Sequence, residues 1–72
     1  MSDNYEQKKA LAIAFIVKHF SVSHYVAGSV MAYAESNIEH DERGLSRTDV
    51  LLKATSDVVV ALSYVALLNE EE

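Results

Sequence analysis

The residues best suited to chemistry lie in the acidic stretch from Glu35 to Glu42, which reads ESNIEHDE. Glu35 and Glu39 are four residues apart, so they would share a helix face and could hold a divalent cation with His40. The Glu-x-x-His pair of helical metal sites is missing, because Asn37 stands where His40 would need a glutamate. We therefore expect a solvated acidic helix end here, with no metal and no cofactor.

The remaining reactive side chains show no catalytic pattern. The chain has no cysteine, which excludes disulfides, thiolate zinc sites and cysteine nucleophiles. The serines lack a G-x-S-x-G context, and there is no glycine-rich phosphate loop. His19 and His24 are five residues apart, which does not align them on one helix face. The sequence predicts a protein that is not an enzyme.

The charge pattern bears on possible partners. Six lysine or arginine residues against eleven aspartate or glutamate residues give a net charge of −5. A nucleic-acid surface needs a basic stripe, and the basic residues here are dispersed: Lys8, Lys9, Lys18, Arg43, Arg47 and Lys53. Nucleic-acid binding is therefore disfavoured.

The apolar runs bear on location. The run Ala10–Val17 follows acidic residues and precedes no clear cleavage site, unlike a secretion signal. The longest apolar runs fall short of the roughly 20 residues that cross a bilayer. We expect a cytoplasmic protein without a membrane partner.

Local signals predict an all-α chain. Proline is absent, and the only glycines are Gly28 and Gly44. Within RGLSRTDV, Ser46 is a good helix N-cap with Asp49 three residues later, and Gly44 suits the end of a preceding helix. Residues 1–72 are thus expected to form a single helical domain. A helix over about 4–41 and a turn over about 42–46 would precede an antiparallel helix over about 47–68.

The stretch FSVSHY, from Phe20 to Tyr25, leaves two alternatives for the first helix. Serines and a β-branched valine weaken a helix at Ser21–Ser23 without forbidding one. Alternatively, Ser21 could cap a new helix. The sequence favours one continuous or kinked helix over a true break, and hence an antiparallel helical hairpin.

Apolar residues recur at helical spacing and mark the expected core faces. In the last helix, Thr55 is the one polar residue on that face, and its hydroxyl could bond to the carbonyl four residues earlier. The apolar members of the three faces are Leu51, Ala54, Val58, Leu62 and Val65; Ile13, Ile16, Val17 and Phe20; and Val26, Val30, Tyr33 and Ala34.

Both helices also carry apolar residues away from these faces. Leu11 and Phe15 point away from the first face, and Val60, Tyr64 and Leu67 lie opposite the last. A chain of 72 residues is too small to cover two sides of each helix. These five residues are therefore the expected interface of a homodimer or higher oligomer, which would form a helical bundle.

These features favour a small non-enzymatic interaction protein: a regulator, inhibitor or adaptor that binds itself and another protein. The charged turn and the adjacent acidic face are the expected partner-binding surface, because loops carry function more often than cores do. Its residues are Glu35, Glu39, Arg43 and Arg47.

Two other functions stay open. The oligomer interface could hold a small molecule, lined by Tyr25, Tyr33, His19 or His24. Alternatively, the chain could be a nucleic-acid regulator that uses basic residues on a helical face: Lys8, Lys9, Lys18 and Lys53. The two-helix dimer plan resembles small plasmid and phage regulators in outline, and such a likeness does not determine function.

Overall fold

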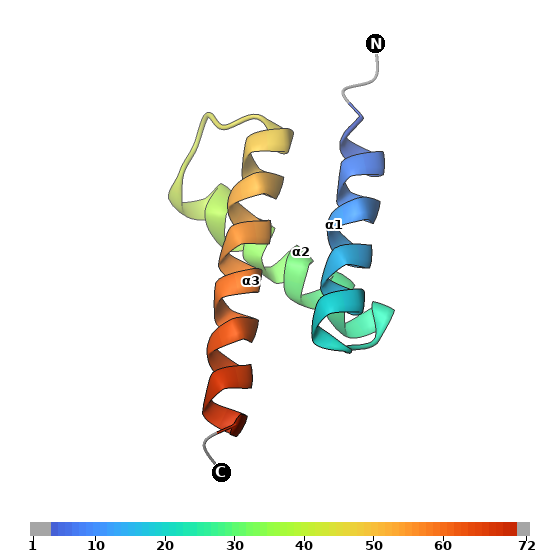
Figure 1. The fold of residues 1–72 in the computed structure, drawn as a ribbon. Coiled ribbons are helices and arrows are strands. Elements are labelled where there is room, and N and C mark those ends of the chain that lie inside the picture. The colour runs from blue at the N-terminus through green and yellow to red at the C-terminus, as the bar shows by residue number, and fades with distance from the viewer. Residues whose placement is uncertain (1–3, 71–72) are drawn as a thin grey trace.

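The computed structural model describes residues 4–70, which form three helices and no strand. Helix α1 spans Tyr5–Phe20, α2 spans His24–Asp41 and α3 spans Arg47–Glu70. Figure 1 shows the chain descending along α1, returning behind as α2 and descending again along α3. The expected all-α class is confirmed, with three helices where the sequence favoured two.

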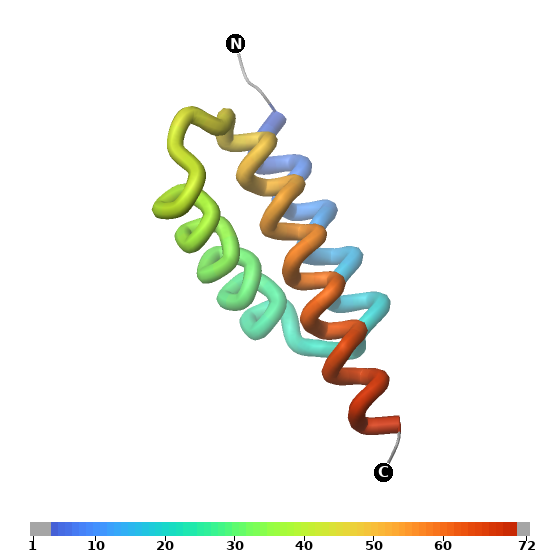
Figure 2. Tube along the Cα trace, turned by 90° about the vertical axis from the view of Figure 1, so that its left-hand side faces the viewer, coloured from blue at the N-terminus to red at the C-terminus, as the bar shows by residue number. Residues whose placement is uncertain are grey.

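The three helices contact one another and form an elongated bundle. Its radius of gyration is 12.9 Å, compared with about 11 Å for a globular domain of this length. Figure 2 shows α2 alongside α3, with the lower end of α3 extending past the connection between α1 and α2. The last turns of α3 are consequently the least covered part of the bundle.

The favoured continuous or kinked helix over about 4–41 is wrong and the alternative of a true break is confirmed, because α1 ends at Phe20 and α2 begins at His24. Ser21 adopts a left-handed conformation with φ 56°, and its N–H donates to the Val17 carbonyl. Ser23 then caps α2, its hydroxyl oxygen accepting from the Val26 N–H at 3.0 Å. The cap is therefore Ser23 and not Ser21. The break lets α1 fold back onto α2 and α3, which buries the side chain of Ile16 completely.

The two serines at this break are expected to respond to substitution with opposite signs. Ser21→Gly should raise the free energy of unfolding by about 0.5–1 kcal/mol, because glycine adopts positive φ without steric cost. Ser23→Ala should lower it by about 1 kcal/mol through loss of the cap. Urea denaturation followed by circular dichroism measures both. A stabilising Ser23→Ala would contradict the break as described.

The connection between α2 and α3 forms largely as the sequence predicts. The Ser46 hydroxyl accepts from the Asp49 N–H at 3.1 Å and caps α3. Gly44 has φ +90°, although it lies within the turn and not directly at the end of α2. Lys53 Nζ reaches Glu42 Oε1 at 2.9 Å and ties α3 to the end of α2.

The core lies where the three helices meet. Its largest fully buried side chains are Ile16 of α1, Met31 of α2 and Leu51 of α3. The Thr55 hydroxyl donates to the Leu51 carbonyl at 2.7 Å, as predicted, and lies 3.8 Å from the Met31 sulfur. In α3, Val58 is buried and Leu62 is partly buried against the core, whereas Val65 of the expected core face is 50% exposed.

The expected core face of α2 is confirmed for Val30 and Ala34, which are partly buried against the core, and wrong for its other two members. Val26 and Tyr33 are 44% and 70% exposed, whereas Ala27, Met31 and Ile38 are buried. Because a new helix starts after Ser23, the rotation of α2 about its own axis is independent of the rotation of α1. Its small and flexible side chains face the other two helices, where close packing favours them.

Candidate functional site

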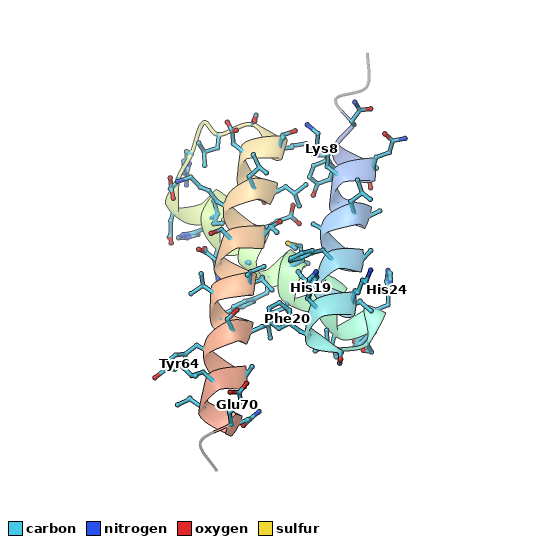
Figure 3. The ribbon with its side chains drawn as sticks, viewed as in Figure 1. Lys8, His19, Phe20, His24, Tyr64 and Glu70 are labelled. Carbon is cyan, nitrogen blue, oxygen red and sulfur yellow. The ribbon has the colours of Figure 1, made fainter. Side chains whose placement is uncertain are left out.

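An apolar stripe runs along the outer side of α3. We call Val60, Tyr64 and Leu67 the α3 stripe; these side chains are 65%, 62% and 54% exposed. Helical geometry places Val60 and Leu67 nearly opposite Val58, which is buried in the core. Figure 3 shows Tyr64 pointing away from α1. No described part of the chain covers this stripe.

A second exposed apolar patch lies on α1. Leu11 is 71% exposed and Phe15 is 45% exposed, and we call these two residues the α1 patch. The Phe15 ring packs against the His19 imidazole, with ring centroids 4.1 Å apart. His19 and His24 lie near the end of α1 and the start of α2 (Figure 3). His19 therefore extends the α1 patch with a polar aromatic edge.

The five residues expected to form one interface belong to two separate surfaces. The α3 stripe faces away from the core, whereas α1 packs on the core side of α3. The break at Ser21–Ser23 is the physical reason, since it places the start of α1 beside the start of α3. Arg47 accordingly lies 3.9 Å from the centroid of the Tyr5 ring.

Glu35 is not an exposed partner-binding residue, which corrects the expectation for the acidic face. Its side chain is 9% exposed. One carboxylate oxygen accepts from the Tyr5 hydroxyl at 2.6 Å, and the other lies 3.0 Å from Lys9 Nζ. The carboxylate thus joins α1 to α2 from inside the bundle. A hydroxyl donor and an ammonium group compensate for its burial.

The other three residues of the predicted surface remain exposed. Glu39 and Arg43 lie near the turn, and Arg47 lies at the start of α3. Arg47 also contacts α1, because its guanidinium stacks over Tyr5 and lies 3.8 Å from the Glu6 carboxylate. Of the four predicted residues, Glu39 and Arg43 are thus the two that are exposed and for which the described residues show no ion pair.

The contact between Tyr5, Lys9 and Glu35 is expected to make the fold sensitive to alkaline pH. Burial and the hydrogen bond to Glu35 raise the pKa of Tyr5 above its usual 10.0. The hydrogen bond to Glu35 raises the pKa of Lys9 above its usual 10.5. Because both pKa values are higher in the folded state, their stabilisation is complete below the unfolded pKa and is lost as pH rises through the folded pKa.

Denaturation midpoints measured between about pH 8 and about pH 11 should therefore fall most steeply above about pH 10. Tyr5→Phe should make this fall shallower, because it removes one of the two titrating groups. Tyr25→Phe is the matched control, since Tyr25 is 82% exposed. Equal pH profiles for the two variants would contradict a role for Tyr5.

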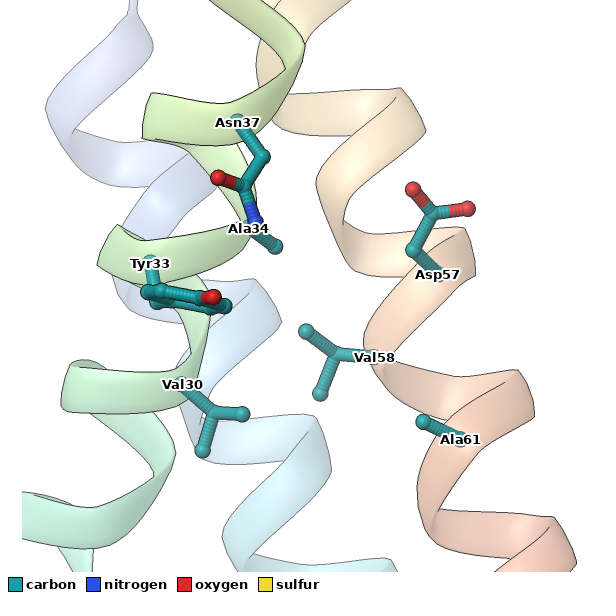
Figure 4. Close-up of a pocket in the computed structure, with 7 residues that line it drawn as sticks. All are labelled: Val30, Tyr33, Ala34, Asn37, Asp57, Val58 and Ala61. Atoms are coloured by element: carbon teal, nitrogen blue, oxygen red, sulfur yellow. The ribbon is translucent and has the colours of Figure 1, made fainter.

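An open cavity of about 310 Å³ lies between α2 and α3. Val30, Ala34, Val58 and Ala61 make its wall apolar. Figure 4 shows the ring of Tyr33 beside it, with Asn37 and Asp57 on opposite helices at one end. Tyr33 is the only residue of the predicted ligand-binding set that lines this cavity. The size and lining suit a small apolar ligand with one polar or cationic group.

A smaller cavity of about 210 Å³ lies where the end of α1 meets the lower part of α3. Its lining is mostly apolar: Phe20, Val22, Leu62, Val65, Ala66 and Asn69. The two cavities show that the lower half of α3 packs loosely against its own chain.

The acidic and basic side chains of the described residues are largely dispersed or paired with one another. Over residues 4–70, no group of three or more His, Asp or Glu side chains is placed to hold a metal ion. Of the four lysines considered for nucleic-acid binding, Lys9 pairs with Glu35 and Lys53 pairs with Glu42. Carboxylates therefore compete with phosphate for half of that basic set.

Helix α3 is the longest helix of the described residues and is largely apolar. The apolar runs are short, yet α3 has 24 residues and contains an 18-residue window of mean hydropathy 1.7. By length and composition alone it could cross a bilayer. Its upper half, however, buries Val50, Leu51, Ala54 and Val58 in the core of the bundle. The core helix of a soluble protein can have the same length and hydropathy.

Comparison with known proteins finds no matching family, no similar curated protein and no similar solved structure.

Proposed function

We propose that this protein is a small non-enzymatic interaction module that forms a homo-oligomeric helical bundle and binds a partner protein. The observation that supports the proposal most is the exposure of the α3 stripe and the α1 patch, five large apolar side chains in all. Exposed apolar surface of this kind marks sites of protein association. The proposed location is the cytoplasm.

The area of the molecule supports self-association. Its accessible surface is 5302 Å², whereas a folded monomer of 8.0 kDa is expected to expose about 4,400 Å². Burying large apolar side chains contributes about 1.5–3 kcal/mol for each one that is fully covered. A small chain has a small hydrophobic core, and without cysteine it cannot be stabilised by disulfides. Oligomerisation is another way to add stability to such a chain.

A second protein is a reasonable partner because the two apolar surfaces are separate. If the α3 stripe is covered by another copy, the α1 patch stays available on each subunit. The exposed residues Glu39 and Arg43 offer a charged surface near the turn. These surfaces fit the role of a regulator, inhibitor or adaptor.

Light scattering at low concentration tests the assembly. We expect a mass of at least two chains of 8.0 kDa each. Leu67→Lys should shift the population toward monomer, because it places a charge in the α3 stripe. Leu52→Lys is the matched control, an exposed leucine on the same helix outside both surfaces. A folded wild-type monomer would refute the proposal.

The cavity between α2 and α3 favours a small-molecule-binding bundle as the second candidate. Its volume of about 310 Å³ lies at the lower end of the range for ligand pockets. Native mass spectrometry of the purified protein should then show co-purified mass. Ala61→Leu, which fills the cavity wall, should abolish that mass and leave the helical content unchanged.

A further inference from the structure

We propose that two copies of this chain pack α3 against α3 in antiparallel orientation, with the two-fold axis level with Ala61 and Leu62. This inference rests on the proposed self-association and specifies its geometry. The surface involved is the α3 stripe, flanked by Ser56 on the same side of the helix. Lys53 of each copy would then pair with Glu70 of the other.

A second copy fits the α3 stripe in shape and size. Val60, Tyr64 and Leu67 recur at spacings of four and three residues, which form a narrow apolar seam along one side of a helix. Such a seam is complementary to an identical seam, as a two-fold interface requires. A standard interface covers about 800 Å² on each partner. The whole molecule exposes 5302 Å², which is about 900 Å² more than expected for a folded monomer of its mass.

Charge favours the antiparallel orientation. Glu70 lies at the C-terminal end of α3, where the helix dipole is negative, and the last turn carries no basic residue. A carboxylate is unfavourable at that end unless a cation lies nearby. Parallel packing would bring the two Glu70 carboxylates together. Antiparallel packing brings each one to the upper half of the other α3, which carries Lys53.

The register follows from equal spacing along the helix. Lys53 and Glu70 are equally far from the midpoint between residues 61 and 62, so an axis there places them at the same level. The same axis puts Leu67 of one copy level with Ser56 of the other. Lys53 already pairs with Glu42 at 2.9 Å, yet both side chains are 48% exposed. The ammonium group has three donors and can donate to a second carboxylate.

Cross-linking tests this geometry directly, because the chain has no cysteine of its own. We compare Val60→Cys with Ser56→Cys, two exposed positions on the same side of α3. Across the proposed axis, the two copies of residue 60 are offset along the helix by about 5 Å, and the two copies of residue 56 by about 17 Å. A short bis-maleimide should therefore join Val60→Cys dimers and leave Ser56→Cys chains unlinked.

Charge reversal tests the ion pair separately. Lys53→Glu and Glu70→Lys should each raise the dimer dissociation constant about three- to tenfold, since each removes two exposed pairs. The double variant should return it to the wild-type range. Glu42→Gln is the control, because it removes the partner of Lys53 within the chain and leaves the proposed pair intact.

The outcomes separate this inference from the proposed function. A dimer in which both cysteine variants cross-link indicates parallel helices and overturns the inference. A dimer in which neither variant cross-links indicates another interface, such as the α1 patch, and overturns it as well. In both cases self-association stands. A monomeric wild type in light scattering overturns both proposals together.

Discussion

Replacing Leu51 with alanine is expected to lower the free energy of unfolding by about 2–5 kcal/mol, which is a large part of the stability of a small domain. Leu51 is 2% exposed and belongs to the core between the three helices. Its removal leaves a cavity that the surrounding helices fill only in part. Urea denaturation of the purified variant measures the loss.

The adjacent residue provides the matched control. Leu52 is 62% exposed, so Leu52→Ala makes the same chemical change without a core cavity. We expect that change to stay within about 0.5 kcal/mol. If the two variants lose stability equally, α3 is rotated differently from the structure described. That result would also move the α3 stripe.

Replacing Glu35 with alanine is expected to lower the free energy of unfolding by about 2–4 kcal/mol. The carboxylate accepts from the Tyr5 hydroxyl and pairs with Lys9, at 9% side-chain exposure. Its loss leaves a hydroxyl without its acceptor and an ammonium group without its counter-charge. Both groups would lie largely away from water, which makes the loss costly.

The control for this variant lies one turn further along α2. Glu39→Ala removes an exposed carboxylate and should change stability by no more than about 0.5 kcal/mol. A double-mutant cycle of Glu35→Ala with Tyr5→Phe should give an interaction energy between about 0.5 and 3 kcal/mol. An interaction energy of zero would show that the bond between α1 and α2 does not form in solution.

The best predicted part of the fold is the connection between α2 and α3. Ser46 caps α3, and Thr55 bonds back to Leu51, as the sequence predicts. Both contacts join residues three or four positions apart. Their geometry is a property of the local backbone, so sequence spacing is sufficient to predict them.

The break between α1 and α2 could not be decided in the same way. A continuous helix and a break at Ser21–Ser23 differ little in local free energy, because serine and valine are modest helix formers. The folded chain adopts the break, with Ser21 left-handed and Ser23 as the cap. The break allows Ile16 to be buried against the other helices, and this burial stabilises the folded chain. The contacting residues are distant in sequence.

Among the site predictions, the exposure that follows from local helical spacing is found in the folded chain, and the prediction that depends on contacts between distant residues is wrong. Leu11, Phe15 and the α3 stripe are exposed in the folded chain, where helical periodicity places them away from the core. The sequence predicts Glu35 on a solvated acidic helix end beside the turn, whereas the folded chain buries it. Its partners Tyr5 and Lys9 lie at least 26 residues away in the sequence, and no spacing rule connects them.

Three features can be read from the amino-acid sequence: the chain is helical, α3 begins near Arg47, and apolar residues occupy more than one side of the helices. Short-range hydrogen bonds and side-chain periodicity decide those features. Three other features emerge only when the helices pack together: α1 folds back, one side of α2 faces inward, and Glu35 is buried with Tyr5 and Lys9. Those features depend on which helix packs beside which, and the free energy of that packing comes from burial between distant parts of the chain.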